Sequence, residues 1–366
     1  MAPAYYFIFF SFILSALLGF IIMPKLLIIS HKHHLYDYPD KRKIHNIPIP
    51  RLGGVIFFPV IIITMAFLMG TRFHLGFEII YIPKLVVLTE FLFLLCGSCI
   101  LFIVGIKDDL VGISYQWKFI AQIICGILLA FAGLWMHNCN GLLGVHLIKA
   151  RYGYLLTIII VVYIINSFNL IDGIDGLASG LACISLTTLG LIFIHEKLLI
   201  YALMSFSTLG VILPFSIYNV FGNQEKGQKI FMGDTGTLTI GYILSFLILK
   251  VNMIDTDPLN KNYSLITLSS MIVPLFDVIR VFIFRISNHR NPFLPDNNHI
   301  HHILLKTGMK CKFVIITILL LELMYVFLNK KIIKYFDINF VIIIDIFLMV
   351  IFIFTIRCVI KRKNRQ

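Results

Sequence analysis

The sequence is poor in charged residues, and poorest in acidic ones. Of its 366 residues, 13% are charged and 59% are hydrophobic, whereas soluble domains have about 25% charged and 45–50% apolar residues. Aspartate and glutamate together number 18 against 31 lysines and arginines, which gives a net charge of +13. This composition excludes an ordinary soluble enzyme. The basic residues stand in short clusters between apolar runs, so they indicate membrane orientation and anionic ligands, and we expect no nucleic-acid partner.

Several sequence signals are missing as well. The chain has no GxxxxGK[ST] segment, so a P-loop ATPase is not supported. Its seven cysteines show no regular spacing apart from Cys96 and Cys99, which lie inside an apolar run and which we interpret as small residues of a packed helix. No internal repeat or low-complexity tract is visible, and we therefore predict a single membrane domain over residues 1–366.

Long apolar runs are what the chain has in abundance. A helix needs roughly 20 mostly apolar residues to cross about 30 Å of hydrocarbon. The runs predict an all-α polytopic membrane protein with about eleven transmembrane helices. The expected spans are residues 5–29, 53–69, 84–106, 117–136, 152–167, 177–194, 198–218, 236–250, 264–286, 313–329 and 338–360.

The loops between these expected spans alternate in character. Every second loop is dense in Asp, Asn, His, Gly and basic residues, and span parity puts all five dense loops on one side of the membrane. They are loops 30–52, 107–116, 168–176, 219–235 and 287–312. The first of them is basic and the chain ends in KRKNRQ, so the positive-inside rule places these loops in the cytoplasm and the N-terminus outside.

The first acidic motif is IKDDLVG, in which Asp108 and Asp109 end an apolar run. Adjacent carboxylates at the edge of the hydrocarbon repel one another and are costly there. A divalent cation or a cationic ligand group would offset that cost. A solvated loop that stops membrane insertion is the simpler alternative.

The second acidic motif is NSFNLIDGIDGLASG, with Asn166, Asn169, Asp172 and Asp175 at intervals of three. This spacing places them on neighbouring turns of one helical face, or on a break between two helices where the glycines allow close backbone approach. Asn and Asp supply the oxygen ligands that Mg²⁺ prefers.

A third carboxylate, Asp234, lies in FMGDTGT just before an apolar helix. A helix N-terminus offers backbone N–H groups and suits a phosphate with its metal ion. An ordinary N-cap aspartate is the alternative.

The last polar motif, PFLPDNNHIHH, concentrates His299, His301 and His302 near Asp296 and Arg290. We interpret these histidines and the arginine as phosphate contacts rather than zinc ligands, because no fourth zinc ligand is evident. A pH-sensing loop is the alternative.

The first cytoplasmic loop carries a basic patch of Lys41, Arg42, Lys43 and His45, followed by PIPRLGG. The lysines fit simple topological flanking charge. The grouping as a whole also fits contact with an anionic headgroup.

Taken together, KRKIHNIPIPRLGG, KDD, NSFNLIDGIDGLASG, FMGDTGT and PFLPDNNHIHH, in this order, resemble the polyprenyl-phosphate N-acetylhexosamine-1-phosphate transferase family, of the glycosyltransferase family 4 type. The likeness covers about residues 5–360 and is greatest to bacterial transferases of N-acetylglucosamine-1-phosphate to undecaprenyl phosphate. The phospho-N-acetylmuramoyl-pentapeptide transferases of peptidoglycan synthesis are the alternative branch. They typically carry three consecutive histidines after Ala-Pro-Ile, where this chain has DNNHIHH.

The resemblance implies transfer of a HexNAc-1-phosphate, most simply GlcNAc-1-phosphate, from a UDP-N-acetylhexosamine to undecaprenyl phosphate, with release of UMP. Such a reaction is the first membrane step in the synthesis of cell-envelope polysaccharides such as the O-antigen of lipopolysaccharide. The resemblance also implies Mg²⁺, with Mn²⁺ as the alternative ion, and an active site on the cytoplasmic side of the bacterial inner membrane. The resemblance also allows a homodimer.

The family pattern also implies roles for individual residues. Asn169 and Asp234 would hold the metal, Asp172 and Asp175 would orient the nucleotide, and Asp108 or Asp109 would deprotonate or position the lipid phosphate. Substrate binding would involve Lys118, Asn166, Arg290, His299, His301 and His302. The chain departs from its relatives in the segment VFGNQEKGQKI and at Asn291, which leaves the sugar preference open.

A transporter or flippase of a phosphorylated solute is the alternative from another class. It would spread ionisable residues along a pathway through the membrane. The isolated acidic residues within the expected spans are Glu90, Asp277, Glu322 and Asp345. We expect Asp277 to pair with Arg280 one turn later. The acidic motifs gather at one membrane surface, and this distribution favours an enzyme.

Overall fold

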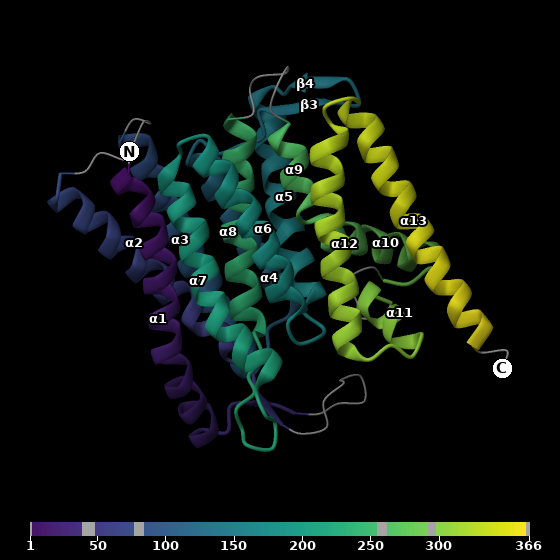
Figure 1. Cartoon of the computed structure of the whole chain (residues 1–366), viewed down its shortest axis with the longest axis horizontal. Helices are drawn as coiled ribbons and strands as arrows, with labels where there is room; N and C mark the ends of the chain where they lie inside the picture. The colour runs from purple at the N-terminus through teal and green to yellow at the C-terminus, as the bar shows by residue number, and fades with distance from the viewer. Residues whose placement is uncertain (1, 39–47, 77–83, 255–261, 292–297, 364–366) are drawn as a thin grey trace.

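The protein is a bundle of long helices, known from a computed structural model that describes residues 2–38, 48–76, 84–254, 262–291 and 298–363. The helices run between two opposite ends, with the N-terminus at the upper end and the C-terminus at the lower right in Figure 1. Within the described residues, nine helical stretches are long and apolar enough to cross a membrane. They are α1 (Ala2–Lys32), η1 (Gly53–Ile56) continued by α2 (Phe57–His74), α3 (Lys84–Val111), α5 (Ala150–Ile171), α6 (Leu177–His195), α7 (Leu199–Phe221), α8 (Gly233–Ile254), α12 (Cys311–Ile332) and α13 (Ile338–Lys363).

A bent helix pair fills the ninth expected span, as one broken span or as a re-entrant loop. Helices α9 (Tyr263–Ser269) and α10 (Ile272–Ser287) meet at 67° within the expected span 264–286. A break of this kind leaves backbone N–H groups without an intrahelical acceptor. The N–H of Val273 donates to the buried Glu322 of α12 at 3.0 Å. The side chain of Glu322 therefore accepts a backbone N–H that the break leaves without an intrahelical partner. This contact accounts for a carboxyl group inside an apolar helix.

The expected span 117–136 is the apolar helix α4 (Tyr115–Phe131), which has 17 residues. Helices lie in all eleven expected spans, so the prediction of an all-α polytopic membrane protein is confirmed, but the described residues hold nine helices of spanning length, or ten if the bent pair is one span, where about eleven were expected. The sequence could not indicate that the ninth run bends or that the fourth gives a short helix, because both follow from contacts between helices.

The remaining elements are short and lie near the ends of the bundle. Strands β1 (Tyr36–Asp37) and β2 (Ile49–Pro50) pair antiparallel, as do β3 (Asn138–Leu142) and β4 (Val145–Leu147). The β3–β4 hairpin lies at the upper end with the N-terminus, whereas α11 (Ile300–Lys306) and the α7–α8 loop lie at the lower end (Figure 1). The described parts of the polar loops share this lower end, in agreement with span parity.

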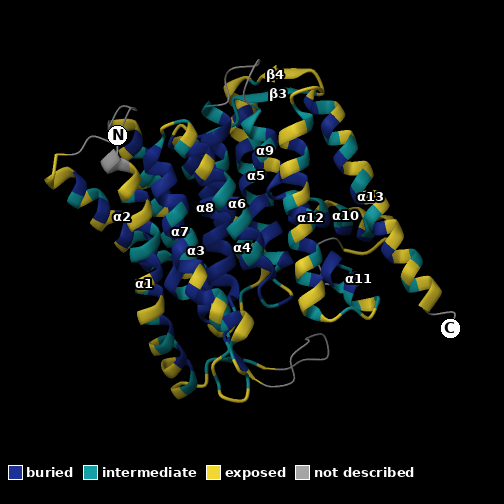
Figure 2. Cartoon of the chain, in the orientation of Figure 1, coloured by how far each residue is buried: buried dark blue, intermediate teal, exposed yellow. Residues whose placement is uncertain are grey.

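Helix α8 forms the centre of the bundle. Of its most apolar stretch 83% is buried, against 28% for α1 and for α13, and it is dark blue along most of its length in Figure 2. Glycines let α3 approach α8 closely: a Cβ on Gly97 would lie 2.1 Å from the Tyr242 hydroxyl, and one on Gly105 would lie 2.5 Å from the Cα of Thr235. Gly97 and Ser98 separate Cys96 and Cys99, which are both free cysteines and of which Cys96 is exposed. The tight packing of Gly97 against α8 agrees with their interpretation as residues of a packed helix.

Candidate functional site

A pocket of about 700 Å³ lies at the lower end of the bundle. Its walls come from the segment after α1, the ends of α5 and α7, the α5–α6 break, the α7–α8 loop, the start of α8, α11 and the start of α12. The lining includes the polar side chains of Asp37, Arg51, Asn169, Asp172, Asp175, Asn219, Gln224, Lys229, Asp234, His302 and Lys312.

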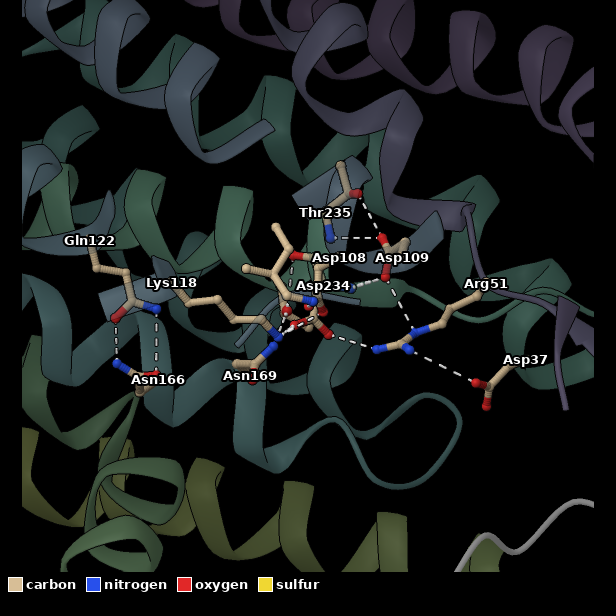
Figure 3. A network of polar contacts seen from close by, with 12 residues as sticks. Asp37, Arg51, Asp108, Asp109, Lys118, Gln122, Asn166, Asn169, Asp234 and Thr235 are labelled. Carbon is tan, nitrogen blue, oxygen red and sulfur yellow. Dashed lines mark hydrogen bonds and ion pairs between the residues drawn. The ribbon is translucent and has the colours of Figure 1, made fainter. Parts of the chain in front are cut away.

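Three carboxylates meet beside this pocket. Asp108 and Asp109 lie in the last turn of α3, and Asp234 lies in the first turn of α8. One oxygen from each lies within 4.8 Å of the others, and Figure 3 shows the three side chains converging. The packing of α3 against α8 thus joins two motifs that are more than one hundred residues apart in the sequence.

Asp109 caps the N-terminus of α8. Its carboxylate accepts the backbone N–H groups of Asp234 and Thr235 at 2.7 and 3.0 Å, and the Thr235 hydroxyl at 2.6 Å. Gly233, with φ of +70°, makes the approach feasible, since a Cβ there would lie 2.6 Å from an Asp109 oxygen. The N-cap alternative weighed for Asp234 therefore applies to Asp109, which caps the helix from a neighbouring one.

Asp108 has different partners. One oxygen accepts the backbone N–H of Ile113 at 2.7 Å, and the other lies 2.7 Å from the Nζ of Lys118. The same ammonium donates to Asp234. Lys118, which is expected to contact phosphate, thus bridges two carboxylates in this structure.

Arg51 joins this carboxylate cluster, although the sequence did not single it out. Its guanidinium lies 2.9 Å from Asp234, 3.3 Å from Asp109 and 3.9 Å from Asp37. Burial by itself lowers the pKa of Arg51, but Asp234 and the other carboxylates outweigh burial and raise that pKa. The PIPRLGG segment was the available signal in the sequence. In the structure, the backbone on either side of Arg51 pairs with the segment before α8, where the Gly53 N–H donates to the Phe231 carbonyl at 2.9 Å.

The residues present fit a divalent metal ion. Carboxylate oxygens from Asp108, Asp109 and Asp234 form a compact set of hard donors of the kind that Mg²⁺ selects. Asn169 donates its amide N–H to the Thr237 hydroxyl at 2.9 Å and lines the pocket. Its amide oxygen is a further candidate ligand for the metal ion. In this structure the positive charges of Arg51 and Lys118 offset two of the three negative charges of the carboxylates.

Asp172 and Asp175 occupy the break between α5 and α6, so the structure selects the second of the two arrangements that their spacing allowed. Helix α5 ends at Ile171, and Gly176 before α6 has φ of +82°. Burial, and secondarily the charges of Asp175 and Asp234, raise the pKa of Asp172 to about 7. Asp175 pairs with Lys229 at 2.6 Å.

Asn219 holds this break in place. Its side-chain oxygen accepts the Gly176 N–H at 2.6 Å, and its amide donates to the Ile230 carbonyl at 2.8 Å. Sequence reasoning missed Asn219 and Lys229, although Lys229 lies within the segment VFGNQEKGQKI that departs from the relatives and Asn219 directly precedes it. Their charge and polarity alone did not indicate a site, because nothing local shows which helix they face.

Asn166 and Arg290, two of the expected substrate-binding residues, do not line the pocket, and neither does Lys118. Asn166 donates to Gln122 of α4 at 2.6 Å (Figure 3), and this contact joins α4 to α5. Arg290 is exposed beyond the end of α10. The expected basic patch at residues 41–45 and Asp296 lie outside the described residues.

The three histidines separate into different environments. His302 lines the pocket, whereas His299 and His301 are 5% and 1% exposed. Burial, followed by the charge of His302, lowers the pKa of His301 to about 3, so His301 is neutral near pH 7. Of the three histidines expected to contact phosphate directly, one, His302, lines the pocket in this structure.

Comparison with known proteins places the carboxylate cluster within matched sequence. The family profile described as Glycosyl transferase family 4 matches residues 91–252. The undecaprenyl-phosphate alpha-N-acetylglucosaminyl 1-phosphate transferases of Escherichia coli (strain K12) and Yersinia pestis are each 31% identical to this chain over 294 residues, which cover 79% of this chain and 75% of each relative. The probable undecaprenyl-phosphate N-acetylglucosaminyl 1-phosphate transferase of Bacillus subtilis (strain 168) is 31% identical over 328 residues, or 86% of this chain and 82% of that protein. The profile match includes all three carboxylates of the cluster.

Proposed function

The chain belongs to glycosyl transferase family 4, as its motifs predicted, and on that premise we propose that it transfers N-acetylglucosamine-1-phosphate to undecaprenyl phosphate. The donor is UDP-N-acetylglucosamine. A phosphate oxygen of the lipid attacks the β-phosphorus of the donor, the bond to the α-phosphate oxygen breaks, and UMP leaves. The product is a lipid-linked diphosphate sugar.

One observation carries this proposal: three carboxylates and two cations converge where a pocket meets the end of a membrane bundle. Phosphoryl transfer between two anions needs positive charge and aligned groups more than covalent chemistry by the protein. A pocket of about 700 Å³ suits a nucleotide-sized ligand. The lipid acceptor reaches the same end of the bundle from the bilayer.

A divalent metal ion, Mg²⁺ in the first place, belongs to the proposal. Asp234 and Asn169 would hold it, with an oxygen from Asp108 beside them. When bound, the ion supplies positive charge to the diphosphate of the donor. Lys118 and Arg51, which neutralise Asp234 in this structure, are then available to bind phosphate oxygens.

The remaining site residues have distinct tasks in this proposal. Asp108 faces the Lys118 ammonium and receives or orients the proton of the lipid phosphate. Asp109 holds the start of α8 and thereby aims Asp234. Asp172 and Asp175 orient the nucleotide at the far wall of the pocket, and His302 contacts a phosphate. The site lies on the cytoplasmic side, where UDP-sugars are supplied.

The acidic residues inside the helices argue against a transport pathway. Each has a local partner: Glu90 pairs with Lys250 at 2.7 Å, Asp277 with Arg280 at 2.6 Å, and Asp345 accepts from Asn329 at 2.7 Å. Glu322 accepts the backbone N–H at the α9–α10 break. These groups belong to different helix contacts, and we infer that they stabilise the bundle.

A donor panel tests the proposal. Purified protein in nanodiscs is supplied with undecaprenyl phosphate, Mg²⁺ and one of UDP-GlcNAc, UDP-GalNAc or UDP-MurNAc-pentapeptide, and lipid-linked product is measured. We expect product and UMP in equal amounts with UDP-GlcNAc. Product from UDP-MurNAc-pentapeptide alone would instead assign the peptidoglycan branch, and no product with any donor from folded protein would refute a transferase.

A further inference from the structure

The histidine motif is anchored by a carboxylate outside the pocket. Asp277 of α10 is 1% exposed. One of its oxygens lies 2.8 Å from Nδ1 of His299, and the other accepts the backbone N–H of Ile300 at 3.0 Å. Because an ionised carboxylate accepts hydrogen bonds and cannot donate them, this contact places a proton on Nδ1 of His299 and fixes the orientation of the ring.

Arg280 completes the anchor from one turn further along α10. Its guanidinium donates to Asp277 at 2.6 Å and also to the backbone carbonyl of Asn298. The expected pairing of Asp277 with Arg280 is thereby confirmed, but the pair does more than neutralise a charge. Together the two side chains hold the three consecutive residues that lead into α11.

The anchored residues lie directly before the pocket wall. Helix α11 begins at Ile300, and its first turn carries His301 and His302. The His301 ring lies nearly parallel to that of His299, with an interplanar angle of 7° and centroids 5.9 Å apart, and its centroid is 4.2 Å from that of His302. The three rings thus form a row that leads from the anchored His299 to His302, which lines the pocket.

The packing around His301 leaves little room for its ring to move. A Cβ on Gly173 would lie 2.2 Å from Nε2 of His301, so the ring sits directly against the backbone of the α5–α6 break. That break carries Asp172 and Asp175 on the pocket wall. The start of α11 is thus packed between Asp277 of α10 on one side and the backbone of the α5–α6 break on the other.

We propose that Asp277 is a positioning residue for the nucleotide-sugar donor, which acts by fixing the start of α11 so that His302 meets a donor phosphate. This inference rests on the proposed function, because the donor is the ligand assigned to the pocket. It separates the histidine motif into one contact residue and two residues that hold it.

A kinetic comparison tests the role of Asp277. Asp277→Asn should raise the KM for UDP-GlcNAc about tenfold, because partners that orient a functional side chain typically contribute about 10- to 100-fold. The KM for undecaprenyl phosphate should stay within about twofold. The matched control is Asp345→Asn, a carboxylate of α13 that is 2% exposed and also hydrogen-bonded, for which both KM values should stay unchanged. A merely structural role would lower the amount of active protein and leave both KM values of Asp277→Asn unchanged.

A double-mutant cycle tests whether Asp277 acts through His302. If it does, Asp277→Asn should add less than about twofold to the donor KM when His302→Ala is already present. Two effects that multiply would show independent roles and would overturn the inference. Arg280→Gln is the second variant in case Asp277→Asn fails to fold. It loosens Asn298 while keeping the contact of Asp277 with His299, and it should raise the donor KM by about threefold.

A labelling measurement separates this inference from the proposed function. The rate at which diethyl pyrocarbonate modifies His302 is followed by peptide mass spectrometry in the wild type, Asp277→Asn and Asp345→Asn. We expect the labelling rate of His302 to change by at least about threefold in Asp277→Asn and to stay at the wild-type value in Asp345→Asn. If the wild type makes no lipid-linked product, the proposed function fails while the labelling rate still decides the inference. An unchanged His302 rate in folded Asp277→Asn protein would contradict it.

Discussion

Asp109, at the end of α3, accepts the backbone N–H of Asp234, at the start of α8, with a distance of 2.7 Å. This contact gives the two adjacent aspartates of the KDD motif different tasks. Asp109 uses both oxygens to hold α8, whereas Asp108 pairs with the ammonium group of Lys118. The two residues should therefore respond differently to the same substitution.

Asp109→Asn should mainly lower stability, and Asp108→Asn should mainly lower turnover. An amide has one acceptor oxygen, so Asp109→Asn loses part of the cap on α8, a loss of about 1 kcal/mol and of a few degrees in Tm. Asp108→Asn keeps an acceptor for Ile113 but loses the charge that faces Lys118. Melting curves in detergent and initial rates check both variants. A larger Tm loss for Asp108→Asn together with a larger rate loss for Asp109→Asn would reverse the assignment.

Asp234→Asn should abolish both turnover and the response of the protein to Mg²⁺. Asp234 is the carboxylate shared by the metal-donor set and both cations, so we expect a rate loss of at least about a hundredfold. Ligands that bind the folded state raise Tm, and Mg²⁺ should raise the Tm of the wild type and not that of Asp234→Asn.

The control for the Mg²⁺ response is Asp37→Asn. Asp37 also lines the pocket but is 3.9 Å from Arg51 and belongs to no cluster of metal donors among the described residues. Its Mg²⁺-dependent Tm shift should equal that of the wild type. An equal shift in Asp234→Asn would mean that the ion binds elsewhere.

Asp172→Asn should stabilise the protein at alkaline pH in the absence of Mg²⁺ and substrates. The pKa of Asp172 is raised from 3.8 to about 7, so the folded state holds this proton more tightly than the unfolded state does. The wild type therefore loses stability as the pH rises from about 4 to about 7, and the loss is complete above that range. The Tm advantage of Asp172→Asn should be largest at pH 8 and shrink towards pH 5. An advantage that grows as the pH falls would contradict the raised pKa.

Thiol labelling should place the pocket in the cytoplasm. Tyr335, which is 80% exposed between α12 and α13, lies at the end of the bundle opposite the pocket by span parity, and Tyr335→Cys should react with an impermeant maleimide in intact cells. Lys226→Cys, in the exposed α7–α8 loop, should react after permeabilisation alone. The unsubstituted chain, with its seven cysteines, sets the background. The reverse pattern would place the pocket outside.

The fold and the acidic centre of the site could be predicted because both depend on short stretches of the sequence. Apolar runs of membrane length predict helices directly, and Asp108, Asp109 and Asp234 stand at the ends of such runs. Once α3 and α8 pack side by side, helix ends at one membrane surface bring these carboxylates together.

The partners of the acidic residues were not predictable in the same way. Asn166 has the spacing of a site residue but faces Gln122 of α4, 44 positions away. Arg51 joins the cluster across 183 positions because its backbone pairs with the segment before α8. Neighbouring histidines looked equivalent in the sequence, yet the short helix α11 directs His301 into the packing and His302 to the pocket. These differences depend on which helix faces which.

The most direct test of the central claim follows the β-phosphate of the donor. UDP-GlcNAc labelled with ³²P at the β-phosphate and with ³H in the sugar is incubated with the purified protein, undecaprenyl phosphate and Mg²⁺, and both labels are counted in the lipid fraction. Transfer of a sugar-1-phosphate predicts that ³²P and ³H enter the lipid in equal amounts while unlabelled UMP is released. Entry of ³H while ³²P stays in soluble UDP, or entry of neither label, would contradict it.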